Sequence, residues 1–247
     1  MIYILLCAYN EERNIEKLTN AITVAFNNSP EYKIIIVNDG STDNTLTVLD
    51  KISKNIPLTI LSHEKNLGLG KALETGFNHV FKSVKYPDIL ITMDADNTHN
   101  PELTVQMINE INKSADIIIA SRYAKGGRQL GLSISRKFLS YCAKILLKVF
   151  LPYPGLNDYT CGYRAYNGKI LEKLKNGREF ILDPSFFSTF EILLKSLKFK
   201  PVIKEVPLVL HYENKLGKSK LKLFKTIKKY LLFLIKGRVN TLSIFYL

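Results

Sequence analysis

The 247 residues carry 35 Lys and Arg against 22 Asp and Glu, a net charge of +13, and 46% of them are hydrophobic. This apolar content supports a folded core and excludes an intrinsically disordered chain, and the length fits one large domain or one domain with an appendage. Three widely spaced cysteines argue against a disulfide scaffold and favour a reducing, cytosolic compartment.

The positive charge is confined to two segments of the chain. Residues 211–238 carry a net charge of +8 and residues 125–157 a net charge of +6, which leaves the remainder at −1. Such regional basicity predicts an anionic partner at two places. No apolar run reaches the roughly 18 residues that a membrane span needs, so we expect the chain not to cross a bilayer by itself.

Five apolar, β-branched runs predict buried strands at 2–6, 33–37, 58–61, 89–93 and 116–120. Helix-like segments alternate with them at 11–27, 42–54, 70–82 and 101–112. This alternation predicts an α/β fold with a doubly wound, mostly parallel sheet. In such sheets ligands bind beyond the carboxyl ends of the strands, and the polar motifs of this chain stand at those ends.

The pattern changes after residue 124. The segment GGRQLGLSIS (126–135) is predicted to form a loop, and it leads into an amphipathic helix over 134–151 with a stripe of lysines. A second basic amphipathic helix is predicted over 219–236. Between the two, the segments 161–174 and 184–197 predict two further helices, and 202–210 predicts a strand.

Asp94 and Asp96 leave the end of the predicted strand 89–93. Residues i and i+2 of an extended chain point the same way, so both carboxylates can face one point in space. Two converging carboxylates suit a hard divalent cation such as Mg²⁺ or Mn²⁺ that is shared with phosphate oxygens. In the alternative interpretation, one carboxylate caps the helix near Pro101 and the other is a solvated turn residue.

Other strand ends offer weaker signals. Asp39, next to a tight turn at Gly40, faces the crevice and suits a nucleobase edge or ribose, or else is incidental to a capped turn. The Gly-rich segment 66–76 fits neither the dinucleotide-binding nor the P-loop signature. Arg122, Arg136 and Arg164 are cationic candidates for the crevice, although each alone also fits a surface ion pair.

In their order and spacing these motifs resemble a family 2 glycosyltransferase, and more narrowly its dolichyl- or polyprenyl-phosphate mannosyltransferase branch. The segments that carry the resemblance are AYNEERNI (8–15), VNDGSTDNT (37–45), NLGLGKALETG (66–76), MDADNTHNPE (93–102), ASRYAKGG (120–127), SRKFLS (135–140), CGYRAY (161–166), EVPLVL (205–210) and LGKSKL (216–221). The resemblance covers about 1–222. It implies the GT-A fold and an inverting transfer of a hexose, mannose or glucose, from a nucleotide-diphospho sugar such as GDP-mannose or UDP-glucose to a polyprenyl phosphate.

The resemblance also implies roles for individual residues. The nucleotide sugar would contact Tyr9, Glu11, Asp39, Lys71, Asp94, Ala95 and Asp96. The metal, Mg²⁺ or Mn²⁺, would be held by Asp94, Asp96 and Thr98. Catalysis would depend on Asp96, Arg122, Arg136 and Ser140, and the acceptor phosphate would lie near Arg122, Arg136, Ser140, Lys215 and Lys220.

Two positions depart from the pattern of that branch. Thr98 stands where Gln often serves as a third metal ligand, and Asn214 stands where an Arg is usual. A charge-compensating role of that Arg would pass to Lys215, Lys218 or Lys220, or be lost.

The resemblance divides the chain into a GT-A catalytic domain over 1–210 and a basic, amphipathic membrane-interface segment over 211–247. We expect a protein peripherally bound to the anionic, cytoplasmic face of a membrane, with a membrane-spanning partner subunit as an open possibility. No nucleic acid is expected as a partner, since the lysines lie in apolar helices rather than in an aromatic-studded groove.

Two alternatives remain at the level of sequence. A sugar-hydroxyl acceptor in cell-wall or surface polysaccharide synthesis would require a general base, for which Asp158 is the candidate. A non-enzymatic module that binds anionic lipid or nucleic acid is the other.

Overall fold

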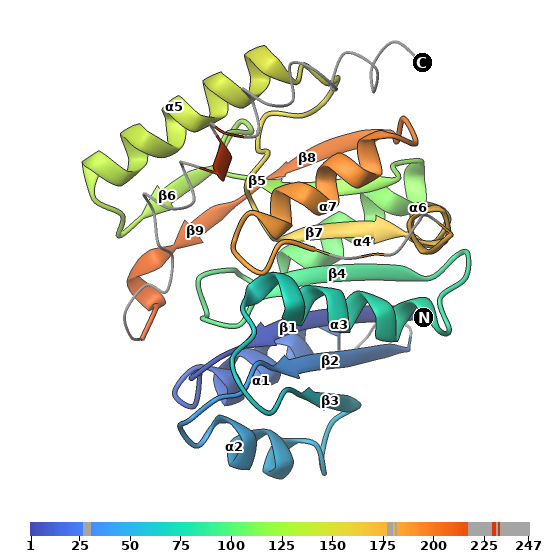
Figure 1. Ribbon diagram of the computed structural model, residues 1–247, viewed down its shortest axis with the longest axis vertical. Coiled ribbons are helices and arrows are strands. Elements are labelled where there is room, and N and C mark those ends of the chain that lie inside the picture. The colour runs from blue at the N-terminus through green and yellow to red at the C-terminus, as the bar shows by residue number, and fades with distance from the viewer. Residues whose placement is uncertain (27–30, 177–179, 181, 217–228, 231, 233–247) are drawn as a thin grey trace.

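The computed structural model describes residues 1–26, 31–176, 180, 182–216, 229–230 and 232. A seven-stranded sheet in the order β3-β2-β1-β4-β7-β5-β8 forms its centre (Figure 1). Neighbouring strands pair in parallel, except that β7 runs antiparallel to both β4 and β5. The strands are β1 Ile2–Ala8, β2 Tyr32–Asn38, β3 Leu58–Ser62, β4 Ile89–Asp94, β5 Ile117–Ser121, β7 Arg164–Asn167 and β8 Ile203–Pro207. The predicted α/β fold with a mostly parallel sheet is confirmed.

Helices cover both faces of this sheet. Helices α3 and α7 pack against each other on the near face in Figure 1, and α1 and α4 lie behind the sheet. The helices are α1 Ile15–Phe26, α2 Thr45–Ile52, α3 Leu69–Phe81, α4 Leu103–Lys113, α5 Ile134–Phe150, α6 Gly168–Lys175 and α7 Ser188–Leu197. The central strands are buried on both sides, as their continuous apolar runs predict.

One predicted helix begins as a strand. Residues 161–174 were expected to be helical, but Arg164–Asn167 form β7, and α6 begins only at Gly168. The Asn167 side chain accepts a hydrogen bond from the backbone N–H of Ile170 and caps this helix. Four residues are too few to show a strand periodicity next to the strongly helical pattern of 168–175.

A small second sheet lies beyond the carboxyl edge of the main sheet. Its strands, β6 Arg128–Leu130 and β9 Val209–His211, pair in parallel. The loop prediction for 126–135 is therefore wrong at β6. The predicted single strand 202–210 is divided at Leu208, whose N–H donates to the carbonyl of Ser121.

Helix α5 is confirmed at nearly its predicted length, 134–150, and lies apart from the main sheet (Figure 1). Leu147 is its one fully buried residue. Among the described residues, no helix has the length and apolarity to cross a membrane. Of the predicted helix 219–236 the structure describes only Lys229, Tyr230 and Leu232, and the rest lies outside the described residues.

The predicted boundary between 210 and 211 falls within β9, which ends at His211. Most of the predicted segment 211–247 lies outside the described residues, so the division into these two parts stays a prediction.

Candidate active site

Parallel pairing brings the ends of β1, β2 and β4 to one edge of the sheet. In the register of these strands Ala8 pairs with Asn38, and Cys7 pairs with Asp94. The residues that follow, Tyr9 and Asp39 among them, therefore leave the sheet side by side. This edge is where the sequence predicts a ligand.

The acidic pair of this edge has two unequal members. Asp94 is 52% exposed at its side chain, whereas Asp96 is buried and its Oδ1 accepts the Thr98 hydroxyl at 2.7 Å. The Asp94 N–H donates to Nδ1 of the buried His99, whose ring stacks on Tyr163 at 4.9 Å.

The second oxygen of Asp96 holds a lysine from far along the chain. Lys215 Nζ donates to Oδ2 of Asp96 across a sequence separation of 119 residues, and 11% of the Asp96 and 14% of the Lys215 side chain is exposed. Burial opposes ionisation of Asp96, but the Lys215 ammonium and the Thr98 hydroxyl hold the pKa of its carboxyl below the ordinary value. Asp96 is therefore charged and paired.

The donor set at this edge fits a hard divalent cation. Asp94 and Asp96 offer carboxylate oxygens and Thr98 a hydroxyl, which are ligand types that Mg²⁺ and Mn²⁺ take. Among the described residues no three His, Cys, Asp or Glu side chains gather into a complete cage. Such a cation would take its remaining ligands from water or a bound phosphate.

Gly162, at the end of the segment 158–162, lies beside Asp94. A Cβ added at Gly162 would make ordinary contacts of 3.6 Å with Oδ1 of Asp94 and with the side chain of Thr189, which shows how close this segment comes to the carboxylate. Cys7, Thr92 and Leu69 line a small cavity at the same place.

Asp39 is buried and engaged with the loop that precedes α3. Its carboxylate accepts the backbone N–H groups of Leu67 and Gly68, each at 2.9 Å, and lies 2.7 Å from Nδ1 of His63. Those amides are therefore already bonded, and a phosphate would have to displace Asp39 to reach them. Lys71, one turn into α3, pairs with Glu74 at 3.0 Å.

The other predicted nucleotide-binding residues lie at the ends of β1 and β4. Tyr9 is half-buried, Ala95 is buried, and Glu11 is buried with its Oε2 accepting the Asn14 amide at 2.7 Å. Lys220, a predicted contact of the acceptor phosphate, lies outside the described residues.

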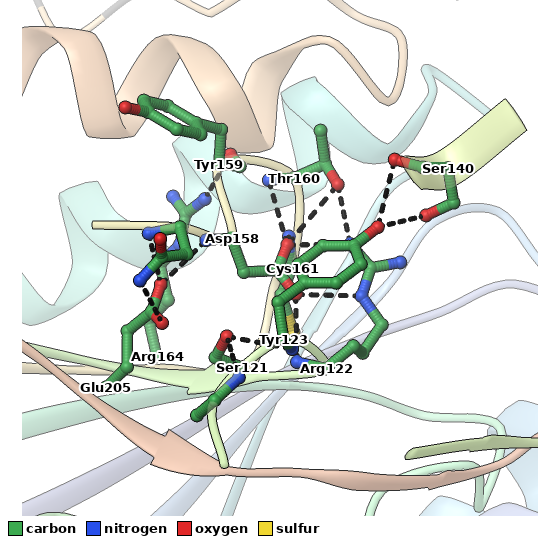
Figure 2. Close-up of polar contacts among 12 residues, drawn as sticks. Ser121, Arg122, Tyr123, Ser140, Asp158, Tyr159, Thr160, Cys161, Arg164 and Glu205 are labelled. Carbon is green, nitrogen blue, oxygen red and sulfur yellow. Dashed lines mark hydrogen bonds and ion pairs between the residues drawn. The ribbon is translucent and has the colours of Figure 1, made fainter. Parts of the chain in front are cut away.

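Arg122, at the end of β5, forms a buried bidentate ion pair with Asp158. Its Nε donates to Oδ2 at 2.8 Å and its Nη2 to Oδ1 at 2.7 Å, and Nη2 also reaches the Thr160 hydroxyl (Figure 2). The backbone N–H groups of Asn157 and Asp158 donate to Glu205 on β8. Burial alone would raise the pKa of Asp158, but the Arg122 guanidinium holds it below the ordinary value.

The remaining predicted site residues, Ser140 and two arginines, lie in different surroundings. The Ser140 hydroxyl on α5 lies 2.6 Å from the Tyr123 hydroxyl. The Tyr123 hydroxyl also donates to the Ser140 carbonyl (Figure 2). Arg136, on the same helix, donates to the Tyr212 hydroxyl at 3.0 Å. Arg164 does not face the crevice, because it is fully buried and donates to the carbonyls of Thr189 and Tyr159.

Residues 3–175 match the family described as glycosyl transferase family 2. The chain belongs to this family. It is 32% identical to the dolichol-phosphate mannosyltransferase of Pyrococcus furiosus, over 93% of this chain and 61% of that protein. It is 31% identical to the polyprenol monophosphomannose synthase of Mycolicibacterium smegmatis, over 69% of this chain and 63% of that protein. The chain thus spans about three fifths of the length of these two relatives.

A third relative has a length closer to that of this chain. The undecaprenyl-phosphate mannosyltransferase of Micrococcus luteus is 30% identical over 86% of this chain and 84% of that protein. Among solved structures, glucosyl-3-phosphoglycerate synthase of Mycobacterium tuberculosis with Mn²⁺, UDP and glucosyl-3-phosphoglycerate matches 96% of this chain and 79% of that chain, with a TM-score of 0.69 and 17% identity. This likeness shows the fold alone, and it agrees with the GT-A fold that the sequence resemblance implies.

The family motifs contain contacts that sequence reasoning missed. His99 and Tyr123 stand inside the segments 93–102 and 120–127, but nothing local shows that one stacks on Tyr163 and the other bonds Ser140. Glu205 had a usable signal, because an acid inside the apolar segment 202–210 requires a partner. It holds the backbone of Asn157 and Asp158.

Proposed function

We propose that this chain transfers a hexose, mannose or glucose, from a nucleotide-diphospho sugar to a polyprenyl phosphate. Family membership and three relatives named for polyprenyl-phosphate mannosyl chemistry support the proposal. Asp94, Asp96 and Thr98 would hold Mg²⁺ or Mn²⁺, and the bound cation would neutralise charge on the departing nucleoside diphosphate. GDP-mannose and UDP-glucose are the donors that we would try first.

The environment of Asp158 carries the choice of acceptor. A sugar hydroxyl must lose its proton during transfer and needs a general base, whereas a polyprenyl phosphate is already an anion at neutral pH. Asp158, the candidate base, is fully buried and bonded to Arg122 and to the N–H of Cys161, which leaves it poorly suited to collect a proton. A phosphate acceptor therefore fits this site better than a sugar hydroxyl.

Within this proposal Arg122 is a positioning residue. Through Asp158 it fixes the segment 158–162, which passes Asp94 at Gly162. Arg136 and Ser140 lie on α5, close to the crevice through Tyr212 and Tyr123, and we assign them to the acceptor phosphate.

We further propose that α5 rests in the interface of an anionic, cytoplasmic membrane leaflet. Apolar residues on this helix have large exposed fractions: 85% for Ile134, 68% for Phe138 and 70% for Val149. Lys137 and Lys148 on the same helix are also exposed. Apolar burial and attraction between lysines and anionic lipid act together at such a surface.

The transfer reaction is tested with the purified chain in vesicles that contain dolichyl or undecaprenyl phosphate. Labelled GDP-mannose or UDP-glucose is added with Mn²⁺ or Mg²⁺, and the label that enters the organic phase is counted. We expect an organic-soluble product that disappears with EDTA. Label recovered only in water-soluble saccharide would contradict a lipid phosphate acceptor. Product formed by this chain alone would show that no membrane-spanning partner subunit is required.

A further inference from the structure

Asp96 holds an internal cation at the place where the proposed function puts a metal. Lys215 Nζ bonds Oδ2, and the Thr98 hydroxyl and N–H occupy Oδ1. Both oxygens of the carboxylate are therefore engaged by groups of the chain itself. A divalent ion on Oδ2 would lie against the Lys215 ammonium, and two positive charges in a largely buried site repel strongly.

The backbone around Lys215 is fastened to the acidic motif. The N–H of His211 donates to the carbonyl of Thr98 at 3.0 Å, just before the short 3₁₀ turn Tyr212–Asn214. On the other side, the carbonyl of Leu216 accepts the Asn14 amide at 3.2 Å. These two contacts hold the backbone on both sides of Lys215, so the fold itself places the lysine next to Asp96.

The same turn also connects Asp96 to α5. The Tyr212 hydroxyl accepts from Arg136 at 3.0 Å, and Lys215 Nζ lies 5.8 Å from the centre of the Tyr212 ring. Tyr212 therefore lies between a cation on α5 and the cation on Asp96. A lysine released from Asp96 would remain beside the proposed metal site, where the donor diphosphate would bind, and on the side of the crevice next to Arg136.

We propose that Lys215 is the resident counter-ion of Asp96, that a divalent cation displaces it, and that the freed ammonium then binds phosphate oxygens in the crevice. The exchange keeps Asp96 neutralised in both states. The last step rests on the proposed function, whereas the displacement concerns the metal alone. Lys215 thus takes over the charge of the Arg that the mannosyltransferase branch usually has at position 214.

The first test measures Mn²⁺ binding by electron paramagnetic resonance, without nucleotide or lipid. While the Lys215 ammonium occupies the Asp96 carboxylate, Mn²⁺ cannot bind there, so the apparent Mn²⁺ affinity is reduced to the fraction of molecules in which the carboxylate is free. We therefore expect Lys215→Met to bind Mn²⁺ at least about fivefold more tightly than wild type. Lys215→Arg retains the charge and should show no such gain. Lys204→Met, which removes a surface lysine paired with Glu110, controls for net charge.

The second test measures nucleotide binding at saturating Mn²⁺, with UDP and GDP as probes. We expect Lys215→Met to bind the preferred diphosphate about fivefold more weakly, because a phosphate-facing cation is lost. Tighter metal binding together with weaker diphosphate binding is a pattern that loss of a merely structural lysine would not give. Mn²⁺ affinity that is unchanged or lower in Lys215→Met would overturn the displacement.

A third measurement uses the wild-type chain. Amine labelling of Lys215, read by mass spectrometry, should rise several-fold when Mg²⁺ alone is added, because displacement exposes the ammonium. Labelling that does not respond to Mg²⁺ would also overturn the proposal. Failure to find a lipid product would leave these metal measurements unaffected, so the two hypotheses fail separately.

Discussion

The charged residues of the sheet edge and those of helix α5 differ in their exposure to solvent. At the edge, Asp39, Asp96 and Asp158 are buried, and each carboxylate accepts several hydrogen bonds. On α5, Lys137 and Val149 are both exposed to solvent. Buried groups that make several hydrogen bonds keep a fixed geometry, and a reaction that makes and breaks particular covalent bonds requires such a geometry. Binding to a fluid anionic surface, which we propose for α5, requires no such fixed geometry.

Breaking the ion pair behind the edge should have the largest effect on the protein. Arg122→Met leaves Asp158 fully buried without its partner, and breaking a buried pair costs about 3–5 kcal/mol. We expect urea unfolding to show a loss of this size. Lys204→Met, which breaks the exposed pair with Glu110, should cost less than about 1 kcal/mol. Equal losses in the two variants would mean that the edge is no more tightly built than the surface.

In Arg122→Met the contribution of Asp158 to stability should depend on pH in the opposite direction to that in wild type. In wild type the folded pKa of Asp158 is depressed, so its contribution to stability is present above the unfolded value of about 3.9 and is lost as pH falls through the folded pKa. Without Arg122, burial would raise that pKa, and stability would be lost as pH rises. The difference in unfolding free energy between wild type and Arg122→Met should therefore widen from pH 5 to pH 7. A difference that is constant over this range would contradict the assignment.

Asp94→Asn should separate function from stability at the same edge. The carboxylate is half exposed, so its loss should leave the melting temperature nearly unchanged. Loss of a charged metal ligand should lower lipid-linked transfer by about 100-fold or more. Asp50→Asn, at an exposed position on α2, is the matched control and should transfer normally. Full activity in Asp94→Asn would remove the metal from the proposal.

The sequence predicted best what is encoded locally. Asp94 and Asp96 follow a short apolar run, and α5 repeats its apolar residues with a helical period, so both could be located without a structure. The strand β6 could not, because its pairing with β9 joins segments about 80 residues apart. The pairs Arg122–Asp158 and Lys215–Asp96 also join distant parts of the chain, so the partners of these two cations could not be predicted from the sequence.

A matched pair of valines tests whether α5 differs from ordinary exposed surface. Val149 on α5 is 70% exposed and Val24 on α1 is 75% exposed. We expect Val149→Asp to weaken flotation with anionic vesicles about tenfold, since burial of a valine is worth about 1.5 kcal/mol and the new charge repels the lipid. Val24→Asp should float as wild type does. If the two variants float alike, α5 is not the membrane-binding face.

The smallest expected effect concerns the contact that joins the two regions. Tyr123 follows β5 directly after Arg122, and its hydroxyl bonds both the hydroxyl and the carbonyl of Ser140 on α5. Tyr123→Phe should cost about 1 kcal/mol of unfolding free energy, the usual net value of a hydrogen bond. Ser140→Ala should cost less, because the carbonyl of residue 140 still accepts from Tyr123.

A double-mutant cycle measures what the two hydroxyls contribute together. If they bond each other, the double variant should be less destabilised than the sum of the single variants, by about 0.5 kcal/mol or more. Additive losses would mean that the two hydroxyls do not bond each other, so that α5 is held to the edge by the bond from Tyr123 to the Ser140 carbonyl and by the packing around Leu147. In that case any coupling between α5 and the edge would run through this carbonyl bond and through the contact of Arg136 with Tyr212.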